Sequence, residues 1–351
     1  MPTRSISAPK RLPGSGDPVY LATDAIGDAW SWLVLREAVL EGVTRFNAFQ
    51  SRLGIARETL AGRLDHLAAG GLIERDGPDY RLTPCGKDLF GCLVAVMHWG
   101  DCWCGGEGPT ESEMTHRGCG CRFKPVFRCS ACRKPLGPRD VVVDAVAQTS
   151  TELIGGQRHR APGLDLLQRV RPCSIARTLR VCGDRWSSLV IRECFMRTRR
   201  FDDFARRLGI APNILAQRLN RLVDLGMLAR QPYQFRPLRY EYRLTEMGLD
   251  YYPIPLAMLT WAQHWLRDAK RGIVLRHRLC GQHFTAILTC EHCAAPVSRD
   301  DIDVQTKCGP AALANKEALA KNDDVAGRVG EHPHASENSG ATCIDDTGSG
   351  R

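Results

Sequence analysis

The chain contains the same pattern twice, and this internal repeat constrains its fold more than any other feature. The motif Gly-Asp-x-Trp occurs at residues 27–30 and 183–186, and Leu-Gly-Ile-Ala occurs at 53–56 and 208–211, so the copies lie 155 to 156 residues apart. Tyr-Arg-Leu-Thr recurs at 80–83 and 242–245, which gives the second copy seven more residues just before that motif. Self-similarity at a nearly fixed spacing indicates a duplicated structural unit. A chain of 351 residues is long enough for two such domains.

Both copies predict the same order of elements. A helix begins near Gly-Asp-x-Trp, a short helix follows at 46–52 or 201–207, and a turn with Gly-Ile-Ala precedes a second short helix. Two strands around a polar loop come next, as in a β-hairpin, and a last helix carries aromatic residues. This order predicts a mainly α (α+β) chain with two tandem winged helix-turn-helix domains.

The segment Ala211–Leu222 has two chemically different faces if it is helical. Leu215, Leu219 and Leu222 recur at helical spacing and can be buried together. The opposite side carries amide and guanidinium groups and no acid. Asn and Gln can pair with adenine, and Arg with guanine, in the major groove of DNA. We therefore predict a base-reading helix, with an ordinary solvated face as the alternative; its candidate residues are Asn213, Gln217, Asn220 and Arg221.

The equivalent positions of the first copy are Glu58, Gly62, Asp65 and His66. Two acids would repel phosphates, and a glycine weakens a helix, although Glu or Asp can accept a hydrogen bond from cytosine. The first copy is therefore expected to read DNA less well, and it remains open whether it reads DNA at all.

Other arginines of the second copy are candidates for contacts to the DNA backbone. Arg206 and Arg207 suit phosphates, which position a protein without specifying sequence. Arg236 and Arg239 lie beside a proline in the longer hairpin loop, which can reach a minor groove, with an ordinary polar loop as the alternative. For Arg63 and Arg218, a structural ion pair is at least as good an explanation as a DNA contact.

The second copy resembles HxlR-type transcriptional regulators, of the MarR-like superfamily, over essentially its whole domain. Four family motifs occur in order: Cys-x-Ile-Ala-Arg-Thr-Leu at 173–179, Gly-Asp-Arg-Trp at 183–186, Pro-Asn-x-Leu-x-Gln-Arg-Leu at 212–219, and Glu-Tyr-x-Leu-Thr-Glu-x-Gly at 241–248. The first copy resembles the family more weakly, with Asp17 in place of the opening Cys and a hairpin cut short at 76–78. The resemblance implies a winged-helix DNA binder that works as a homodimer and has no enzymatic activity. Fusion of two copies then predicts an internal pseudo-dimer.

The chain contains 16 cysteines, and some of them recur at equivalent positions in the two copies. After each winged helix the pattern His-x2-Cys-x9-Cys-x2-Cys occurs, at an offset of 161. Four such side chains complete the tetrahedral shell of a structural zinc, which would also support a hairpin too short to build its own core. We predict a Cys-rich β-hairpin with its own zinc site in each copy, with ordinary surface His residues as the alternative. The two sets are His116, Cys119, Cys129 and Cys132, and His277, Cys280, Cys290 and Cys293.

Two thiol-based functions compete with this interpretation. Some HxlR-type regulators sense oxidants through the Cys at the position of Cys173, but a sensor needs an exposed thiolate, and a quiet, partly buried Cys is the preferred expectation. A thiol-redox enzyme built on the Cys-x-x-Cys pairs would need a βαβ pattern, and none is visible. A third alternative keeps the fold but uses it for protein contacts instead of operator reading.

Composition divides the chain and suggests its compartment. Net charge is +9 with a pI near 8.9, which suits a polyanionic partner such as double-stranded DNA. No apolar run reaches membrane-spanning length and no secretory signal is visible, so a cytoplasmic protein is expected. The expected segments are a leader (1–16), winged helix one (17–104), Cys-rich hairpin one (105–145), a linker (146–170), winged helix two (171–268), Cys-rich hairpin two (269–306) and a disordered tail (307–351).

Overall fold

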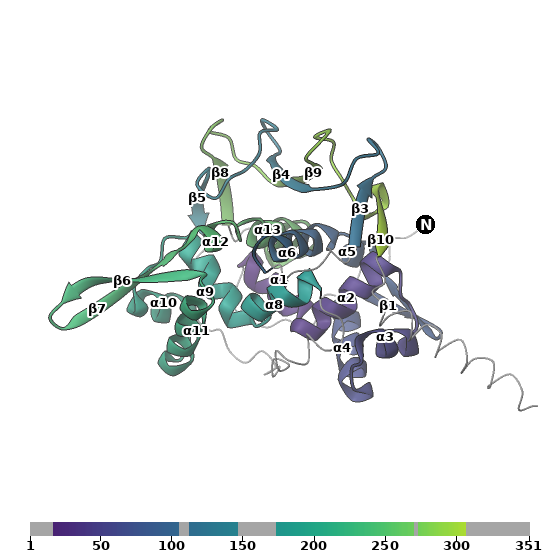
Figure 1. Ribbon diagram of the computed structural model, residues 1–351, viewed down its shortest axis with the longest axis horizontal. Helices are drawn as coiled ribbons and strands as arrows, with labels where there is room; N and C mark the ends of the chain where they lie inside the picture. Colours follow the sequence, from purple (N-terminus) through teal and green to yellow (C-terminus); the bar gives the residue numbers. More distant parts are fainter. Residues whose placement is uncertain (1–16, 105–111, 147–172, 270–272, 307–351) are drawn as a thin grey trace, which may run out of the picture. The chain divides into compact units, whose positions relative to one another are not determined.

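The two copies fold into the same succession of helices and strands. The computed structural model describes residues 17–104, 112–146, 173–269 and 273–306, which belong to one compact unit (Figure 1). The first copy consists of α1 (Pro18–Ile26), α2 (Ala29–Glu41), α3 (Phe46–Leu53), α4 (Arg57–Ala69), β1 (Ile73–Asp76), β2 (Asp79–Leu82), α5 (Pro84–Lys87) and α6 (Phe90–Trp103). The second consists of α8 (Ser174–Cys182), α9 (Arg185–Phe195), α10 (Phe201–Leu208), α11 (Pro212–Asp224), β6 (Leu228–Phe235), β7 (Leu238–Leu244), α12 (Glu246–Leu249) and α13 (Pro253–Trp265). The chain is therefore mainly helical, with two tandem winged helix-turn-helix domains.

The Gly-Asp-x-Trp motif starts a helix and also fixes the candidate reading helix. Asp28 and Asp184 cap α2 and α9 by accepting hydrogen bonds from Ser31 N and Ser187 N. The same carboxylates form ion pairs with the candidate reading helices, at 2.6 Å to Arg63 in α4 and 3.0 Å to Arg218 in α11. Both arginines therefore have the structural role considered for them, in equivalent places. Helices α1 and α8 precede the motif and were not expected from it.

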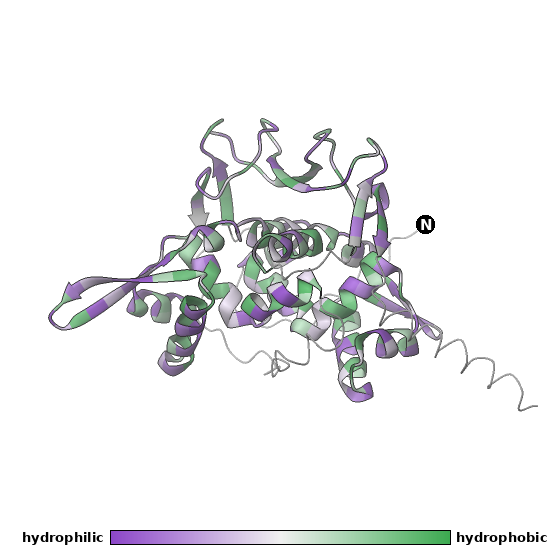
Figure 2. Cartoon of the chain, viewed as in Figure 1, coloured by the Kyte–Doolittle hydropathy of each residue, from purple (hydrophilic) through white to green (hydrophobic). Residues whose placement is uncertain are grey.

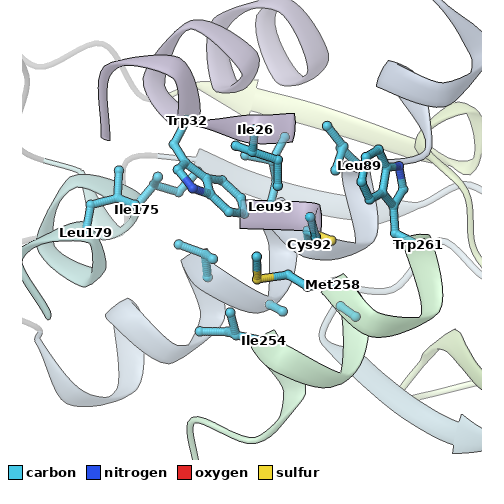
Figure 3. Close-up of a cluster of buried hydrophobic side chains, with 14 of the residues drawn as sticks. Ile26, Trp32, Leu89, Cys92, Leu93, Ile175, Leu179, Ile254, Met258 and Trp261 are labelled. Carbon is cyan, nitrogen blue, oxygen red and sulfur yellow. The ribbon is translucent and has the colours of Figure 1, made fainter. Parts of the chain in front are cut away.

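A shared hydrophobic core joins the two copies. Helix α1 packs on α13, α8 packs on α6, and α6 packs on α13. In Figure 3, Ile26 and Trp32 of the first copy lie in one cluster with Ile175 and Met258 of the second. All four side chains are at most 6% exposed.

Two tryptophans make reciprocal hydrogen bonds between the copies. Trp99 Nε1 donates to the carbonyl of Met247 at 3.1 Å, and Trp261 Nε1 donates to the carbonyl of Cys85 at 3.0 Å. These pairs are equivalent under the repeat offset of 162. Each copy thus binds the other through the same groups, as in an isologous interface.

The strands that follow the winged helices pair between copies. They are β3 (Ser112–His116), β4 (Pro125–Cys129), β5 (Val141–Val146), β8 (Ile273–His277), β9 (Ala286–Cys290) and β10 (Ile302–Thr306), with short helical turns η1 (Arg267–Ala269) and η2 (Arg299–Asp301). β3 pairs with β10, β4 with β9 and β5 with β8, all antiparallel. Phe127 lies opposite Leu288, its own counterpart in the repeat.

This pairing corrects the expectation that each Cys-rich segment forms a hairpin with itself. Each segment does contain strands, and the expected valine strand in the first copy exists as β5, but the strand-to-strand pairs join the two copies. Within a segment, the chain folds back on itself through isolated bridges such as Thr115 with Arg122 and Arg128 with Pro135. The physical reason is that backbone groups at a strand edge need partners, and the equivalent segment of the other copy supplies them as well as the same segment does. The expected linker residues 147–170 and the leader and tail lie outside the described residues.

Candidate nucleic-acid interface and metal clusters

The polar face of α11 is exposed, as a base-reading helix requires. Asn213, Gln217 and Asn220 are exposed, while Leu215, Leu219 and Leu222 are fully buried. Proline at the first position of α11 suits a helix start because its missing N–H needs no partner there. Three amide side chains thus project from one rigid helix, available for major-groove contacts.

Arg221 has a different environment from the other three candidates. Its Nη2 donates to the carbonyl of Arg180 at 2.5 Å, and the residue is half-buried. In the first copy, His66 Nε2 lies 3.1 Å from the carbonyl of Asp24, the equivalent contact. Because both copies use this position to tie the reading helix to the end of the first helix, the geometry favours a structural role for Arg221 over base reading.

Arg206 and Arg207 also separate in the structure. Arg206 is largely exposed, and among the described residues its ion pair is with the half-buried Asp203, a contact that a phosphate can replace. Arg207 Nε lies 2.5 Å from Oε2 of buried Glu193, as Arg52 does with Glu37 in the first copy. Arg206 therefore remains suited to phosphate contact, whereas Arg207 holds the domain together.

The wing of the second copy is long and basic at its end. Strands β6 and β7 pair up to the tip, with an irregularity between Pro232 and Gln234, so the expected loop shortens to Arg236 and Pro237. Arg236 and Arg239 are exposed, and no ion pair involves either of them in the described parts of the chain. Both guanidinium groups are therefore suited to contact an anionic partner.

The first copy presents a different surface at the same places. Glu58, Gly62 and Asp65 are exposed on α4, so two carboxylates replace two amides. The short wing β1–β2 ends in Asp76 and Asp79, which lie opposite each other and pair with arginines. Figure 2 marks the outer faces of α4 and α11 as hydrophilic, but their charges differ. The first copy is therefore less suited to contact a polyanion.

The Cys and His side chains gather into two clusters. The first contains His116, Cys119, Cys290 and Cys293, and the second contains Cys129, Cys132, His277 and Cys280. In each cluster all four candidate ligand atoms lie within 4.8 Å of one another. His116 Nδ1 lies 3.2 Å from Cys119 Sγ and 3.4 Å from Cys293 Sγ, and His277 Nδ1 lies 3.4 Å from Cys280 Sγ and 3.2 Å from Cys132 Sγ. Zn–S bonds of about 2.3 Å and Zn–N bonds of about 2.0 Å, arranged tetrahedrally, place ligand atoms about 3.5–3.8 Å apart. The clusters fit a four-coordinate metal.

This arrangement corrects the expected grouping of ligands. We expected His116, Cys119, Cys129 and Cys132 to close one site within the first copy, and the equivalent four residues to close another. Instead, the His-x2-Cys half of each copy meets the Cys-x2-Cys half of the other. The exchange follows from the pairing of β4 with β9, which carries each Cys-x2-Cys turn to the partner's His. Sequence spacing alone cannot distinguish the two groupings, because the segments are equivalent.

The Cys-x2-Cys turns hold an unfavourable backbone conformation. Arg133 and Ala294, which follow the second Cys of each turn, have φ of 61° and 57°. A non-glycine residue in the left-handed region costs about 1–2 kcal/mol. The N–H of each donates to the carbonyl of the first Cys, Cys129 or Cys290, at 2.9 and 3.0 Å. Strain repeated at both turns indicates that the surroundings hold the thiols in place.

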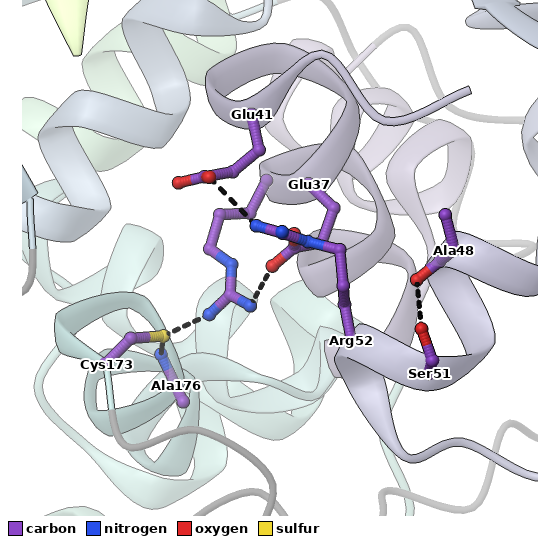
Figure 4. A network of polar contacts seen from close by, with 8 residues as sticks. Glu37, Glu41, Ala48, Ser51, Arg52, Cys173 and Ala176 are labelled. Atoms are coloured by element: carbon purple, nitrogen blue, oxygen red, sulfur yellow. Dashed lines mark hydrogen bonds and ion pairs between the residues drawn. The ribbon is translucent and has the colours of Figure 1, made fainter. Parts of the chain in front are cut away.

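Cys173 is buried between the copies, next to an arginine of the first. It is 6% exposed, caps α8 by accepting from Ala176 N, and receives a hydrogen bond from Arg36 Nη1 at 2.6 Å (Figure 4). The equivalent pair in the other direction is Asp17 with Arg192, at 2.7 Å. The reciprocal contact explains why an Asp can stand where the other copy has a Cys: both accept from the partner's arginine. Burial restricts access of an oxidant to this thiol.

The arginine beside Cys173 also belongs to a buried charge network. Arg36 pairs with Glu37, and Glu37 also pairs with Arg52, which reaches Glu41 at 2.8 Å (Figure 4). Burial raises the pKa of Glu37, but the two arginines outweigh this effect and hold it below its usual value of 4.5. Sequence analysis missed this network. The signal was the Arg-Glu pair at 36–37 and 192–193, which is identical in both copies.

Comparison with known proteins identifies the family. The model of the HxlR-like helix-turn-helix family matches twice, at residues 25–107 and 181–270. An uncharacterized HTH-type transcriptional regulator of Mycobacterium tuberculosis (strain CDC 1551 / Oshkosh) is 40% identical over 139 residues, which cover 39% of this chain and 88% of the relative. The chain belongs to the HxlR-like helix-turn-helix family. Its relatives are named as transcriptional regulators, so this chain is a DNA-binding regulator by family.

Further relatives are similar over shorter stretches. An uncharacterized HTH-type transcriptional regulator of Synechocystis sp. is 34% identical over 97 residues, covering 27% of this chain and 72% of the relative. Among solved structures, a candidate transcription factor from Pseudomonas aeruginosa is 37% identical and matches 40% of this chain and 94% of its own, with a TM-score of 0.30. Within the described residues, no helix is both long and apolar enough to cross a membrane.

Proposed function

We propose that the chain is a cytoplasmic, sequence-specific transcriptional regulator that reads double-stranded DNA mainly with its second winged helix. The observation that carries this proposal is the exposed face of α11, where Asn213, Gln217 and Asn220 project from a helix anchored by Leu215 and Leu219. Amide side chains on one face can make bidentate contacts to adenine. In this proposal the protein binds DNA and has no catalytic role.

In the same proposal the two copies act as an internal pseudo-dimer. The reciprocal bonds of Trp99 and Trp261, and the reciprocal arginine contacts of Cys173 and Asp17, support it. A two-fold protein places its reading helices in major grooves about one turn of DNA apart. Because the two reading helices differ in charge, the preferred operator is asymmetric, with one half-site strongly specified and the other weakly.

Selection of bound sequences from random duplex DNA tests this proposal. We expect one well-defined half-site and a second, poorly defined one about a helical turn away. Replacement of Asn213, Gln217 and Asn220 together by Ala removes the preference for the defined half-site, at about 1–3 kcal/mol per lost bidentate contact. The matched control is Glu58→Ala with Asp65→Ala in the first copy, which leaves the preference unchanged. Equal selectivity in the α11 variant and the unmodified chain would contradict the assignment.

Salt dependence separates the arginines of the second copy. Arg206→Ala is expected to weaken binding to all sequences alike and to reduce the slope of log K against log salt by about 1. Arg221→Ala, whose guanidinium is bound to the carbonyl of Arg180, is expected to lower thermal stability instead. A change of base preference in Arg221→Ala at unchanged stability would return Arg221 to the reading residues.

We further propose that each Cys/His cluster holds one structural zinc ion. Three thiolates and one imidazole in a closed shell are a ligand set that zinc prefers, and four protein ligands leave no position for a substrate. The spacing of the ligand atoms and the strained backbone after each Cys-x2-Cys turn support the proposal. With ligands from both copies, each zinc would also cross-link the pseudo-dimer.

Paired substitutions distinguish exchanged sites from sites within a copy. Cys119→Ala with Cys290→Ala removes two ligands of one exchanged cluster, so zinc measured by mass spectrometry should fall from two ions per chain to one. Cys119→Ala with Cys129→Ala damages both exchanged clusters and should remove both ions. Sites closed within a copy would give the reverse result. Cys121→Ser, outside both clusters, is the control and should keep two ions.

A further inference from the structure

One face of strand β7 carries aromatic and aliphatic side chains as far as the hairpin tip, and Arg230 of β6 stands over the Tyr240 ring, 4.4 Å from its centroid. Successive residues of a strand point to opposite faces, so Leu238, Tyr240 and Tyr242 share one face of β7. Tyr242 is buried and packs edge-on against Phe204 of α10, with ring centroids 6.5 Å apart. Burial decreases from Tyr242 to Leu238. The face that joins the core at the base of the wing therefore continues into solvent at the tip.

Two large apolar side chains meet at this tip. Phe235 lies directly opposite Leu238 in the strand pair, where cross-strand side chains stand on the same face. They are 75% and 53% exposed, and no other two of the exposed large hydrophobic residues in the described ranges are paired in this way. Hydrophobic residues are visible at the far end of the hairpin in Figure 2. The two side chains contribute little to the stability of the fold, because most of each remains exposed to solvent.

Positive charge surrounds the apolar pair. Arg236 forms the turn with Pro237, and Arg239 lies opposite Gln234 on the other face of the hairpin. The nearest acid on the wing, Glu241, lies 2.6 Å from Arg243 and is thus already paired. An apolar tip bordered by guanidinium groups without an ion-pair partner among the described residues suits duplex DNA. Its stacked bases can accept the apolar side chains, and its phosphates can pair with the guanidinium groups.

We propose that Phe235 and Leu238 form a wedge that enters the minor groove beside the half-site of α11 and opens a base step there. This proposal rests on the proposed DNA-binding function and adds a site to it. Phe and Leu side chains that insert between base pairs kink duplexes by about 20–90°. Burial of both side chains offsets the lost stacking, while Arg236 and Arg239 hold the phosphates on either side. Because insertion unstacks a base step, the wedge favours a pyrimidine–purine step at this position, which is flexible and easily kinked.

The first copy has no equivalent wedge. Its wing ends at Asp76, Gly77, Pro78 and Asp79, with no large apolar side chain and two carboxylates that phosphates repel. The kink therefore falls on one side of the operator only. In bound DNA, the position of the bend would be determined by the half-site that α11 occupies.

The test compares full-length variants on the operator selected with the unmodified chain. The probe duplex carries 2-aminopurine at the step under the wing and a fluorophore pair at its ends. Phe235→Ala with Leu238→Ala should bind about tenfold more weakly, because two apolar side chains are no longer buried. It should also lose the 2-aminopurine signal and the end-to-end shortening. The slope of log K against log salt and the preference for the α11 half-site should not change.

Two controls separate the wedge from its surroundings. Phe235→Leu keeps an apolar tip and should retain most of the bend. Arg239→Gln should lower the salt slope by about 1 while keeping the 2-aminopurine signal. All these side chains are exposed, so thermal stability should stay unchanged and exclude unfolding as the cause.

The experiment distinguishes failure of the wedge proposal from failure of the proposed DNA-binding function. Unchanged affinity and bend in the double alanine variant would overturn the wedge while leaving DNA binding intact, and would assign the tip to contact with a protein. Failure of the unmodified chain to bind any selected duplex would overturn the DNA-binding function itself.

Discussion

The two copies are alike where they touch each other and different where they face outward. Asp28 and Asp184 cap a helix and hold a reading helix in the same way, and Trp99 and Trp261 bond to equivalent carbonyls. By contrast, the exposed face of α4 carries acids where α11 carries amides. A contact between equivalent groups of the two copies needs both of its partners, so each copy retains them. A surface side chain has no such partner within the chain and is free to differ.

The largest expected effect, on operator preference and affinity, comes from giving the exposed face of α4 the side chains of α11. Glu58→Asn, Gly62→Gln and Asp65→Asn together give α4 the same three side chains as α11. The scaffold of the two domains is equivalent, so the grafted chain should select a symmetric operator with two defined half-sites. Affinity for that operator should rise by about 100-fold, since each new bidentate contact is worth about 1–3 kcal/mol. Selection from random DNA checks this. An operator that remained asymmetric would show that the wings, not the reading helices, distinguish the copies.

A smaller effect is expected from disturbing a contact that the copies share. At Gly100 in α6, an added Cβ would lie 2.3 Å from the carbonyl oxygen of Ser174 and 2.4 Å from Thr178 Oγ1. Gly100→Ala therefore forces α6 and α8 apart and should lower the free energy of unfolding by about 1–3 kcal/mol, as overpacking does. Chemical denaturation measures it. Unchanged stability would mean that the helices separate easily, and would weaken the pseudo-dimer.

Sequence reasoning reached the repeated winged helices because their signals are local. Helical spacing of Leu215, Leu219 and Leu222 and the glycines after each helix depend only on nearby residues. The exchange of strands and of Cys ligands could not be reached in this way. The ligand pattern is the same in both copies of the repeat, and only the three-dimensional path of β4 and β9 decides which Cys meets which His.

The roles of individual arginines show the same limit. Helical periodicity placed Arg221 on the outward face, and Arg206 and Arg207 were expected to contact phosphates. A long side chain can nevertheless fold back onto its own domain, as Arg207 does to Glu193 and Arg221 does to the carbonyl of Arg180. Comparison of the copies offered a clue, since Arg52 is retained in the copy that lacks the amide face.

The contacts of Asp17 with Arg192 and of Cys173 with Arg36 are equivalent, but they are expected to contribute differently to stability. Asp17→Ala leaves buried Arg192 with Glu193 as its remaining ion-pair partner among the described residues. It should cost about 2–3 kcal/mol, less than the roughly 3–5 kcal/mol of a buried charge left without any partner. Cys173→Ala removes the thiol acceptor of Arg36, which still pairs with Glu37, and should cost about 1 kcal/mol. Urea denaturation of both variants checks the order. Cys173→Asp, which copies the other side, should fold normally; a failure to fold would show that the two sites are not equivalent.

The smallest expected effect concerns the reading helix of the first copy. Gly62 is exposed in the middle of α4, and a Cβ there would meet no atom within 4 Å. Glycine inside a helix is less favourable than alanine by about 0.5–1 kcal/mol, so Gly62→Ala should stabilise the protein by this amount. DNA preference should stay the same, because alanine adds no group that reads a base. A gain in stability with altered base preference would mean that α4 lies close enough to the bases to sense one methyl group, and the first copy would then be a reader in its own right.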